Sequence, residues 1–333
     1  MRKLTSLLLL LLQVSAGCSG VASPPDNPEG PPEPPARTTF PYDKLGEGTF
    51  WLTEGSRNYL VDSRSRTFTI NTGTFGYGPA MSPDSRRVAF EIPSAPFINN
   101  KTSIIIADWG QSPAITLVSD DDDKNYPTWS RDGSTVMFMS RDFLVTVARL
   151  RKIDITTRVE TTVNLQIDTR CLGTDLDRVS EAPDGTLAFL AGNPDGTGCY
   201  YPTLFSTRAD GTGKKLIAQP QPKEQFYSPA WSPDGKRIVV GINVNVDPFA
   251  NSYLTKIRLM NADGSSQKDL VSIERHTKYS HETPGDPLCW SADGTRILFG
   301  ALETDSIAHA YSIRPDGTDL TQLTSGFMVD CGR

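Results

Sequence analysis

Histidine is scarce in this sequence, and several chemical signatures are missing. The 333 residues include 3 His, no C-x-x-C pair and no H-E-x-x-H run, which disfavours a zinc site. No G-x-S-x-G elbow is present to carry a nucleophilic serine. The formal net charge of −6 argues against a nucleic-acid partner, because no basic excess would neutralise phosphates.

Long apolar runs and helical patterning are also missing. The one strongly apolar run, Leu7 to Leu12, is too short for a stable membrane span and follows the positive residues Arg2 and Lys3. We therefore interpret residues 1–17 as an export signal. After residue 40 no 3.6-residue periodicity appears, so the remainder is predicted to be all-β.

The end of the signal resembles that of bacterial lipoproteins, in which a Cys is lipidated and becomes the new N-terminus. Ala16, Gly17 and Cys18 match that pattern, whereas Ser15 stands where an aliphatic residue is usual. The resemblance implies that Cys18 is the lipidation site, and an ordinary secretory signal cut nearby is the alternative. Export would place the protein on the outer face of the cytoplasmic membrane or on the outer membrane of a bacterium.

A proline-rich tether follows, so we assign residues 18–44 to the lipidated Cys and this tether. The stretch "VASPPDNPEGPPEPPARTTFP" cannot build a core and should be part polyproline II and part coil. At about 3.1 Å per residue it would reach at most about 65 Å, enough to hold a globular body away from a membrane.

Residues 45–333 contain five copies of one phrase, of which "AWSPDGKRIVV" is the clearest. Its Asp recurs at intervals of 48, 52, 50 and 59 residues. In the phrase, Pro233 pre-sets the turn, Asp234 can bond nearby backbone and Gly235 accepts a positive φ, which predicts a hairpin. The phrase Asp residues are Asp84, Asp132, Asp184, Asp234 and Asp293.

A second turn signal follows each of the last three phrases, at Asp210, Asp263 and Asp316. Two hairpins per period mean four strands per period, and four-stranded modules of about 50 residues are typical of β-propeller blades. The phrase W-S-P-D-G, together with "DLTQLTSG", resembles the TolB-like propeller repeat over roughly residues 45–333. Met81, Ser85 and Glu181 depart from it.

The two ends of the propeller region predict how the ring closes. Strand candidates at 49–54, 58–62 and 66–70 precede the five modules, and one at 327–331 follows them. Together they would form a sixth, composite blade, which protects sheet edges. The alternative is a five-bladed ring with a loose N-terminal hairpin.

Insertions fall at one end of each predicted blade, and loops on a rigid scaffold commonly carry binding sites. Aromatic residues in these loops suit contacts with protein or glycan, although some of them could instead pack locally. The candidate binding face consists of Phe97, Tyr200, Tyr201, Phe226, Tyr227, Phe249 and Tyr279.

Two clusters of acidic or histidine residues are candidate metal sites. The run Asp120 to Asp123 could hold Ca²⁺, but four adjacent carboxylates cannot all converge on one ion, so a solvated turn is favoured. TolB-like propellers include lyases that bind a metal through His, which makes one loop a weak candidate. That loop contains His276, His281, Glu282 and Asp286. No cofactor is expected.

Four Cys remain after Cys18, and an exported chain can join them in three ways. Cys171 and Cys199 lie in loops on the same end of one blade. Cys289 and Cys331 lie in first strands of adjacent blades, around the channel. We therefore predict the pairs Cys171–Cys199 and Cys289–Cys331.

Taken together, the sequence predicts a monomeric, lipid-anchored propeller that serves as a binding or scaffold module for an envelope protein or cell-wall glycan. The alternative is a lyase-like enzyme that acts on polysaccharide through a metal on the loop face. A purely structural envelope protein is a third reading.

Overall fold

The computed structural model describes the body of the chain with gaps. The described residues are 40–54, 57–71, 77–93, 101–109, 114–141, 148–171, 178–196, 198–247, 252–275, 288–302, 308–326 and 328–332. The signal, Cys18 and the tether up to residue 39 lie outside them. No helix among the described residues is long and apolar enough to cross a membrane.

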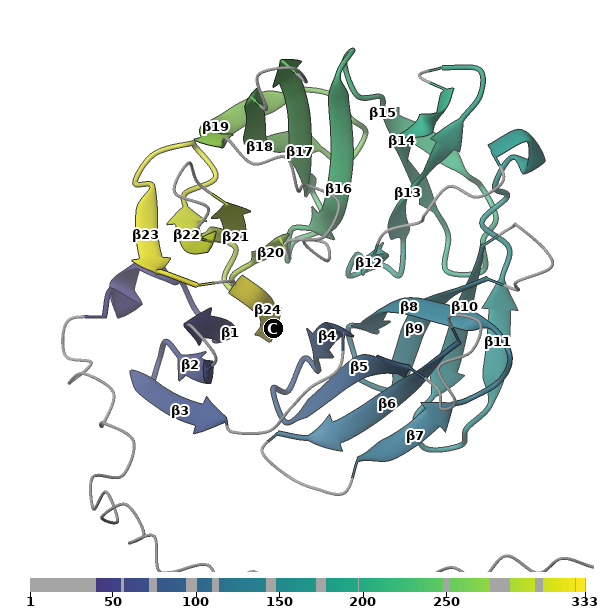
Figure 1. The fold of residues 1–333 in the computed structure, drawn as a ribbon, viewed down its shortest axis with the longest axis horizontal. Helices are drawn as coiled ribbons and strands as arrows, with labels where there is room; N and C mark the ends of the chain where they lie inside the picture. Colours follow the sequence, from purple (N-terminus) through teal and green to yellow (C-terminus); the bar gives the residue numbers. More distant parts are fainter. Residues whose placement is uncertain are drawn as a thin grey trace, which may run out of the picture. The chain divides into compact units, whose positions relative to one another are not determined.

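Six four-stranded antiparallel sheets form a ring, so the predicted six-bladed β-propeller is confirmed (Figure 1). Blade 1 consists of β4 (Tyr77–Met81), β5 (Arg87–Pro93), β6 (Thr102–Asp108) and β7 (Ile115–Val118). Blade 2 consists of β8 (Asp123–Trp129), β9 (Thr135–Arg141), β10 (Arg149–Asp154) and β11 (Glu160–Val163). Blade 3 consists of β12 (Ser180–Glu181), β13 (Leu187–Asn193), β14 (Gly198–Thr207) and β15 (Lys215–Ala218).

The other three blades complete the ring. Blade 4 consists of β16 (Glu224–Trp231), β17 (Arg237–Asp247), β18 (Ser252–Asn261) and β19 (Lys268–Arg275). Blade 5 consists of β20 (Leu288–Trp290), β21 (Ile297–Leu302), β22 (Ala308–Ile313) and β23 (Thr321–Thr324). Blade 6 joins β24 (Met328–Gly332) to β1 (Thr49–Glu54), β2 (Arg57–Asp62) and β3 (Thr67–Asn71). Two short 3₁₀ helices are η2 (Tyr42–Lys44) and η3 (Thr169–Cys171).

The repeated phrase folds as the hairpin between the first two strands of a blade. In blade 4, Ser232 Oγ donates to Asp234 Oδ1 at 2.6 Å, and Asp234 Oδ1 also accepts the Lys236 N–H at 3.1 Å. Gly235 has φ +69°. Ser85, which replaces the glycine in blade 1, adopts φ +58°. The side-chain bonds of Ser and Asp therefore fix the turn even where glycine is missing.

Tryptophan joins neighbouring blades at the start of this hairpin. The Trp129 indole of blade 2 is buried and donates from Nε1 to the Ala80 carbonyl of blade 1 at 3.0 Å. Trp290 of blade 5 donates in the same way to Ala230 of blade 4 at 3.2 Å. Arg87 lies over the Trp129 ring, 5.1 Å from its centroid. The tryptophan of the repeat thus joins neighbouring blades by packing, by a hydrogen bond and by a cation–π contact.

Blade 6 closes the ring as predicted, which rules out the five-bladed alternative. β24 pairs with β1, and Cys331 lies opposite Phe50, the second residue of β1. Trp129 likewise lies opposite Val136, the second residue of β9. Cys331 therefore holds the tryptophan position of its blade. Its disulfide to Cys289 of blade 5 stands where blades 2, 4 and 5 have an indole, with 6.1 Å between the two Cα atoms.

Candidate functional site in the central channel

The first strand of three blades carries a bulge beside the channel. Each bulge places a residue with positive φ directly before a proline, and the ladder register shifts there. The residues are Gly78 (φ +53°), Tyr126 (φ +57°) and Ser228 (φ +44°). A bulge takes backbone groups out of the strand pairing, so these segments can bind side chains instead.

Glu91 is a buried carboxylate held between two of these bulges. It lies on β5, is 6% exposed, and accepts the Tyr126 N–H of blade 2 on Oε1 at 2.6 Å. A Cβ on Gly78 would come within 2.5 Å of the same oxygen, so a larger residue there would have to displace the Glu91 carboxylate. Burial raises the pKa of Glu91 to about 7, although the Tyr126 N–H and the charge of Arg178 oppose the rise.

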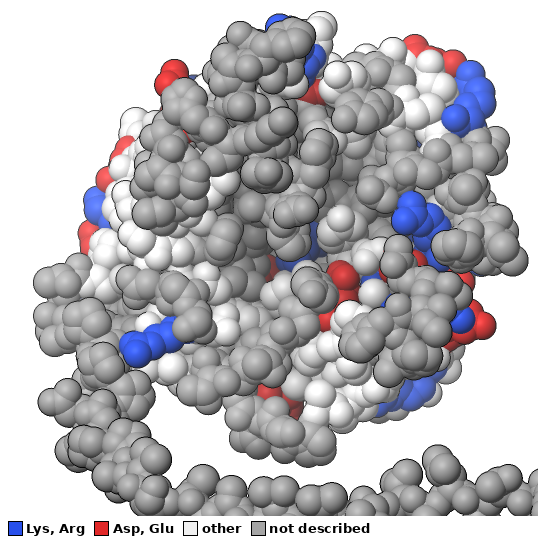
Figure 2. All heavy atoms as spheres, in the orientation of Figure 1, with Lys and Arg blue, Asp and Glu red and all other residues white. Residues whose placement is uncertain are grey.

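Arg178 reaches from the segment before β12 to the other side of the ring. Its Nη2 donates to the Pro79 carbonyl of blade 1 at 3.1 Å. Its Nη1 lies 3.8 Å from Asp330 Oδ2 of β24 in blade 6. Asp330 Oδ2 in turn accepts the Met81 N–H at 2.7 Å. One guanidinium therefore links blade 3 to blades 1 and 6, and both signs of charge gather near the centre of the ring (Figure 2).

A cavity of about 160 Å³ lies beside Arg178 among the inner strands. The residues that line it include Arg131, Arg178, Asp330, Trp231 and Trp290, together with serine and threonine residues. Arg131 borders it at the hairpin end and donates from Nη2 to the Pro233 carbonyl at 2.9 Å. The cavity thus offers donors, acceptors and apolar surface together.

The acidic run Asp120 to Asp123 encloses a cation supplied by the chain itself. The Lys124 side chain is fully buried, and its Nζ donates to the carbonyls of Thr102 and Asp120 at 3.0 Å and of Asp122 at 2.6 Å. Nζ also lies 2.6 Å from Asp120 Oδ1. The predicted solvated turn is confirmed for Asp120 and Asp121, which are exposed, whereas Asp122 and Asp123 are half-buried. What the sequence did not predict is the buried ammonium group beneath the loop.

Arg151 binds the same loop from the third strand of blade 2. Its Nη2 lies 2.5 Å from Asp120 Oδ2, and its Nε lies 2.7 Å from Glu160 Oε1. Burial raises the pKa of Asp120, but hydrogen bonds from Arg151 and Lys124 outweigh burial and hold that pKa well below its usual range. These charges are paired with protein groups, which explains the run without a bound metal.

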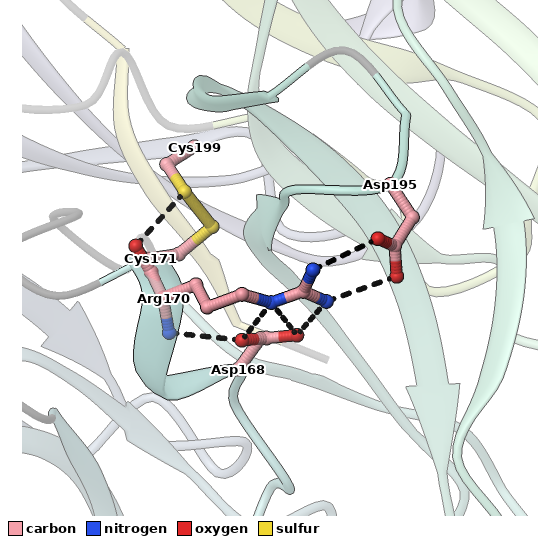
Figure 3. The surroundings of a disulfide bond; sticks show 5 residues. All are labelled: Asp168, Arg170, Cys171, Asp195 and Cys199. Atoms are coloured by element: carbon pink, nitrogen blue, oxygen red, sulfur yellow. Dashed lines mark hydrogen bonds and ion pairs between the residues drawn. A yellow bond between two sulfur atoms is a disulfide. The ribbon is translucent and has the colours of Figure 1, made fainter.

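The predicted pair Cys171–Cys199 is present, with its Cα atoms 4.9 Å apart. It ties η3 to the start of β14, and Figure 3 shows Arg170 beside it, lying between two carboxylates. Arg170 Nη2 donates to Asp168 Oδ2 at 2.7 Å and to Asp195 Oδ2 at 3.0 Å. Disulfide and ion pairs together tie η3 to Asp195 and to the start of β14.

Two aromatic residues of the predicted binding face are buried, so the prediction is wrong for them. Phe226 and Tyr227 belong to β16, and their exposures are 2% and 9%. Phe226 packs in the core cluster that includes Ile238, and a Cβ on Gly241 would come within 2.2 Å of the Tyr227 ring. The hairpin of β16 and β17 extends further than its sequence suggested, so apparent loop residues lie within strands.

The structure describes one further aromatic candidate with its side chain. Tyr201 is half-buried on β14. The rest lie outside the residues described with side chains, namely Phe97, Tyr200, Phe249, Tyr279, His276, His281, Glu282 and Asp286. No group of three or more His, Cys, Asp or Glu in the described part of the chain is arranged to hold a metal ion. The sequence analysis did not identify Glu91, Arg131, Arg178 and Asp330, because their charge was the only signal that the sequence offered.

Comparison with known proteins supports the fold. No protein-family model and no curated protein matches the chain. TolB from Acinetobacter baumannii is similar at 15% identity and a TM-score of 0.62, over 89% of this chain and 68% of that one. A putative TolB from Agrobacterium tumefaciens matches at 17% identity and a TM-score of 0.55, over 75% of this chain and 85% of that one.

An enzyme has a similar fold as well. An oligogalacturonate lyase in complex with manganese matches at 15% identity and a TM-score of 0.50, over 81% of this chain and 70% of that one. At these identities the likeness shows a TolB-like six-bladed propeller and does not select between a binding protein and an enzyme.

Proposed function

We propose that this protein is a lipid-anchored binding module of the bacterial cell envelope, which holds a segment of a partner protein at its central channel. The observation that carries the proposal is the 160 Å³ cavity bordered by Arg131, Arg178 and Asp330. A polypeptide segment presents carbonyls, N–H groups and apolar side chains in alternation. A cavity lined by two arginines, an aspartate and two tryptophans complements that mixture.

Location outside the cytoplasm is consistent with two structural facts. The chain holds two disulfides, which persist in oxidising compartments. Proteins described as TolB have the same fold. The lipid anchor at Cys18 rests on the sequence pattern alone and has its own test. Cys18→Ser should abolish incorporation of a labelled fatty acid and release the protein from membranes, whereas equal labelling of both proteins would contradict the anchor.

Site-specific crosslinking tests the channel. A photoreactive residue at Thr128, on the cavity wall, should give a discrete crosslinked protein in native envelopes. The matched control is the same probe at Leu216, which is 50% exposed on the outermost strand of blade 3. Identical products from both positions, or no product from Thr128, would refute binding at the channel.

The fold also leaves room for the enzyme alternative, because the oligogalacturonate lyase matches over most of this chain. Purified full-length protein should be incubated with oligogalacturonates and Mn²⁺, with and without EDTA. Metal-dependent shortening of the oligosaccharide would favour the lyase reading. Unchanged substrate, together with a Thr128 crosslink, would favour the binding module.

A further inference from the structure

The junction between blades 2 and 3 departs from the chain's own repeat. Glu181 lies opposite Leu187 at the start of the hairpin, in the register that places Trp129 opposite Val136 and Trp290 opposite Ile297. Like those indoles, Glu181 points to the preceding blade, where its Oε2 accepts the Arg131 N–H at 2.8 Å. A carboxylate therefore takes the place of the joining ring.

Three more departures meet at the same junction, on the side of blade 2. Arg131 replaces the turn proline found at Pro83 and Pro233. Thr135 replaces the arginine that covers the indole at the regular junctions, Arg87 and Arg237. Lys152 lies opposite Met137 on the third strand, where the corresponding residue of blade 1 is Ile106 and that of blade 4 is Leu259. Relative to the other blades, a proline is replaced by arginine, an arginine by threonine and an aliphatic residue by lysine.

These substitutions leave a groove of about 300 Å³ between the two blades. Blade 2 contributes its hairpin turn, with Met137, which is 1% exposed, and Lys152. Blade 3 contributes Glu181 and the turn residues Ala182, Pro183 and Gly185. The groove is roughly twice the size of an engineered cavity that binds benzene, so it can hold a small organic molecule.

Four charged residues line the groove, namely Arg131, Asp132, Lys152 and Glu181. Lys152 and Glu181 are half-buried, and no ion pair joins them in the described residues. Lys152 Nζ donates to the Ala209 carbonyl at 3.0 Å, which uses one of its three protons. Glu181 accepts one backbone N–H on Oε2. Burial lowers the pKa of Lys152, and the charges of Glu181 and Asp210 oppose this. Partly desolvated charges are stabilised most by a partner of opposite charge.

We propose that this groove binds a small zwitterion of the α-amino-acid class. Its ammonium group contacts the Glu181 carboxylate, its carboxylate contacts the Lys152 ammonium, and an apolar side chain lies along Pro183. The groove has Arg131 in common with the channel cavity, but Lys152 and Glu181 line only the groove, so this proposal does not require the one under Proposed function.

Calorimetry on the full-length protein tests the proposal. Each of the common amino acids is titrated singly, and acetate and methylammonium serve as ligands with one charge only. We expect at least one apolar or aromatic amino acid to bind with a Kd of about 1 mM or tighter, and at least tenfold more tightly than either singly charged ligand. Absence of binding by every amino acid, or equal binding of acetate alone, would overturn the proposal.

Variants identify the two contacts. Glu181→Gln and Lys152→Gln should each weaken binding about tenfold or more, because each removes a charge-assisted hydrogen bond. Lys268→Gln is the matched control, since Lys268 Nζ makes the same kind of bond, to the Asp316 carbonyl at 2.6 Å, at the junction of blades 4 and 5. Unchanged affinity in both groove variants, or an equal loss in the control, would show that binding lies elsewhere.

Restoring the repeat gives an independent readout. Glu181→Trp should place an indole in the groove and abolish amino-acid binding while the thermal midpoint holds or rises. If that variant fails to fold, the two glutamine variants decide the question. Retained affinity in a folded Glu181→Trp protein would count against the groove.

Discussion

Two neighbouring junctions of the ring use one register for different purposes. Between blades 1 and 2 the position holds Trp129, which is 4% exposed, bonded to Ala80 and covered by Arg87. Between blades 2 and 3 it holds Glu181, half-buried beside a groove. The junction between blades 2 and 3 therefore lacks the ring, although apolar residues of both blades, among them Met137 and Leu187, still form one core cluster. A repeat protein can tolerate this because stability is shared among its modules, and local exceptions of this kind tend to mark functional positions.

The largest loss of stability should come from removing the indole at the junction between blades 1 and 2. Trp129→Ala removes a buried ring and its hydrogen bond, so we expect a loss of about 3–5 kcal/mol in the free energy of unfolding. Glu181→Ala should lose far less, because no indole packs there. Urea unfolding at one temperature measures both. Similar losses in the two variants would erase the distinction between the junctions.

The free energy of unfolding should depend on pH through Glu91, which also joins blades 1 and 2 by its bond to Tyr126. The folded pKa of Glu91 is raised to about 7 from 4.5, so its neutral form favours the native state. This contribution is complete below pH 4.5 and is lost as the pH rises through 7. The expected loss is about 3 kcal/mol.

Glu91→Gln supplies the control for that titration. Its free energy of unfolding should lack this decline between pH 4.5 and pH 7.5, whereas the parent protein should show it. Parallel stability profiles for the two proteins would indicate that Glu91 is ionised throughout or does not couple to folding.

The covalent junction between blades 5 and 6 comes next. Replacing both Cys289 and Cys331 by Ser removes the bridge and leaves Cys171–Cys199 intact. We expect a loss of about 2–4 kcal/mol, because the cross-link restricts the unfolded chain. Chemical denaturation under non-reducing conditions measures it. A double variant as stable as the parent would mean that hydrogen bonding between β24 and β1 suffices for closure.

The smallest effect concerns the cation that covers the indole. Arg87→Ala should cost about 0.5–1 kcal/mol through loss of the contact with the Trp129 ring. In a Trp129→Ala background the same change should cost almost nothing, and a double-mutant cycle reports the difference. Equal costs in both backgrounds would show that Arg87 acts through other neighbours.

Much of the fold could be predicted from the sequence because its signals are local and repeated. Turn chemistry at Asp234 and Asp263 located two hairpins per period. The strands at the two chain ends identified the composite blade, and inner-strand adjacency gave the Cys289–Cys331 pair. Each of these inferences needed only neighbouring residues and one rule of propeller architecture.

The channel site was not predictable in the same way. Arg178 donates a hydrogen bond to the carbonyl of Pro79, which lies 99 positions earlier in the sequence. The residues around Arg178 give no indication of that partner. In the sequence, Glu91 has the pattern of an ordinary polar residue in a strand. Only the structure shows that the bulge at Tyr126 directs a backbone N–H to its carboxylate. Strand length was also underestimated: Phe226 was predicted to lie in a loop, but β16 includes it. Tertiary approach, rather than local propensity, decides such positions.

The composite blade imposes an order of assembly. β1 is made before the other strands of the ring, yet its inner partner β24 follows all of them in the chain. The first three strands must therefore wait, with one edge unpaired, while five blades are synthesised. Only then can β24 pair with β1 and bring Cys331 to Cys289. That disulfide can form only after residue 331 has been made, and it then holds the last strand of the chain against blade 5.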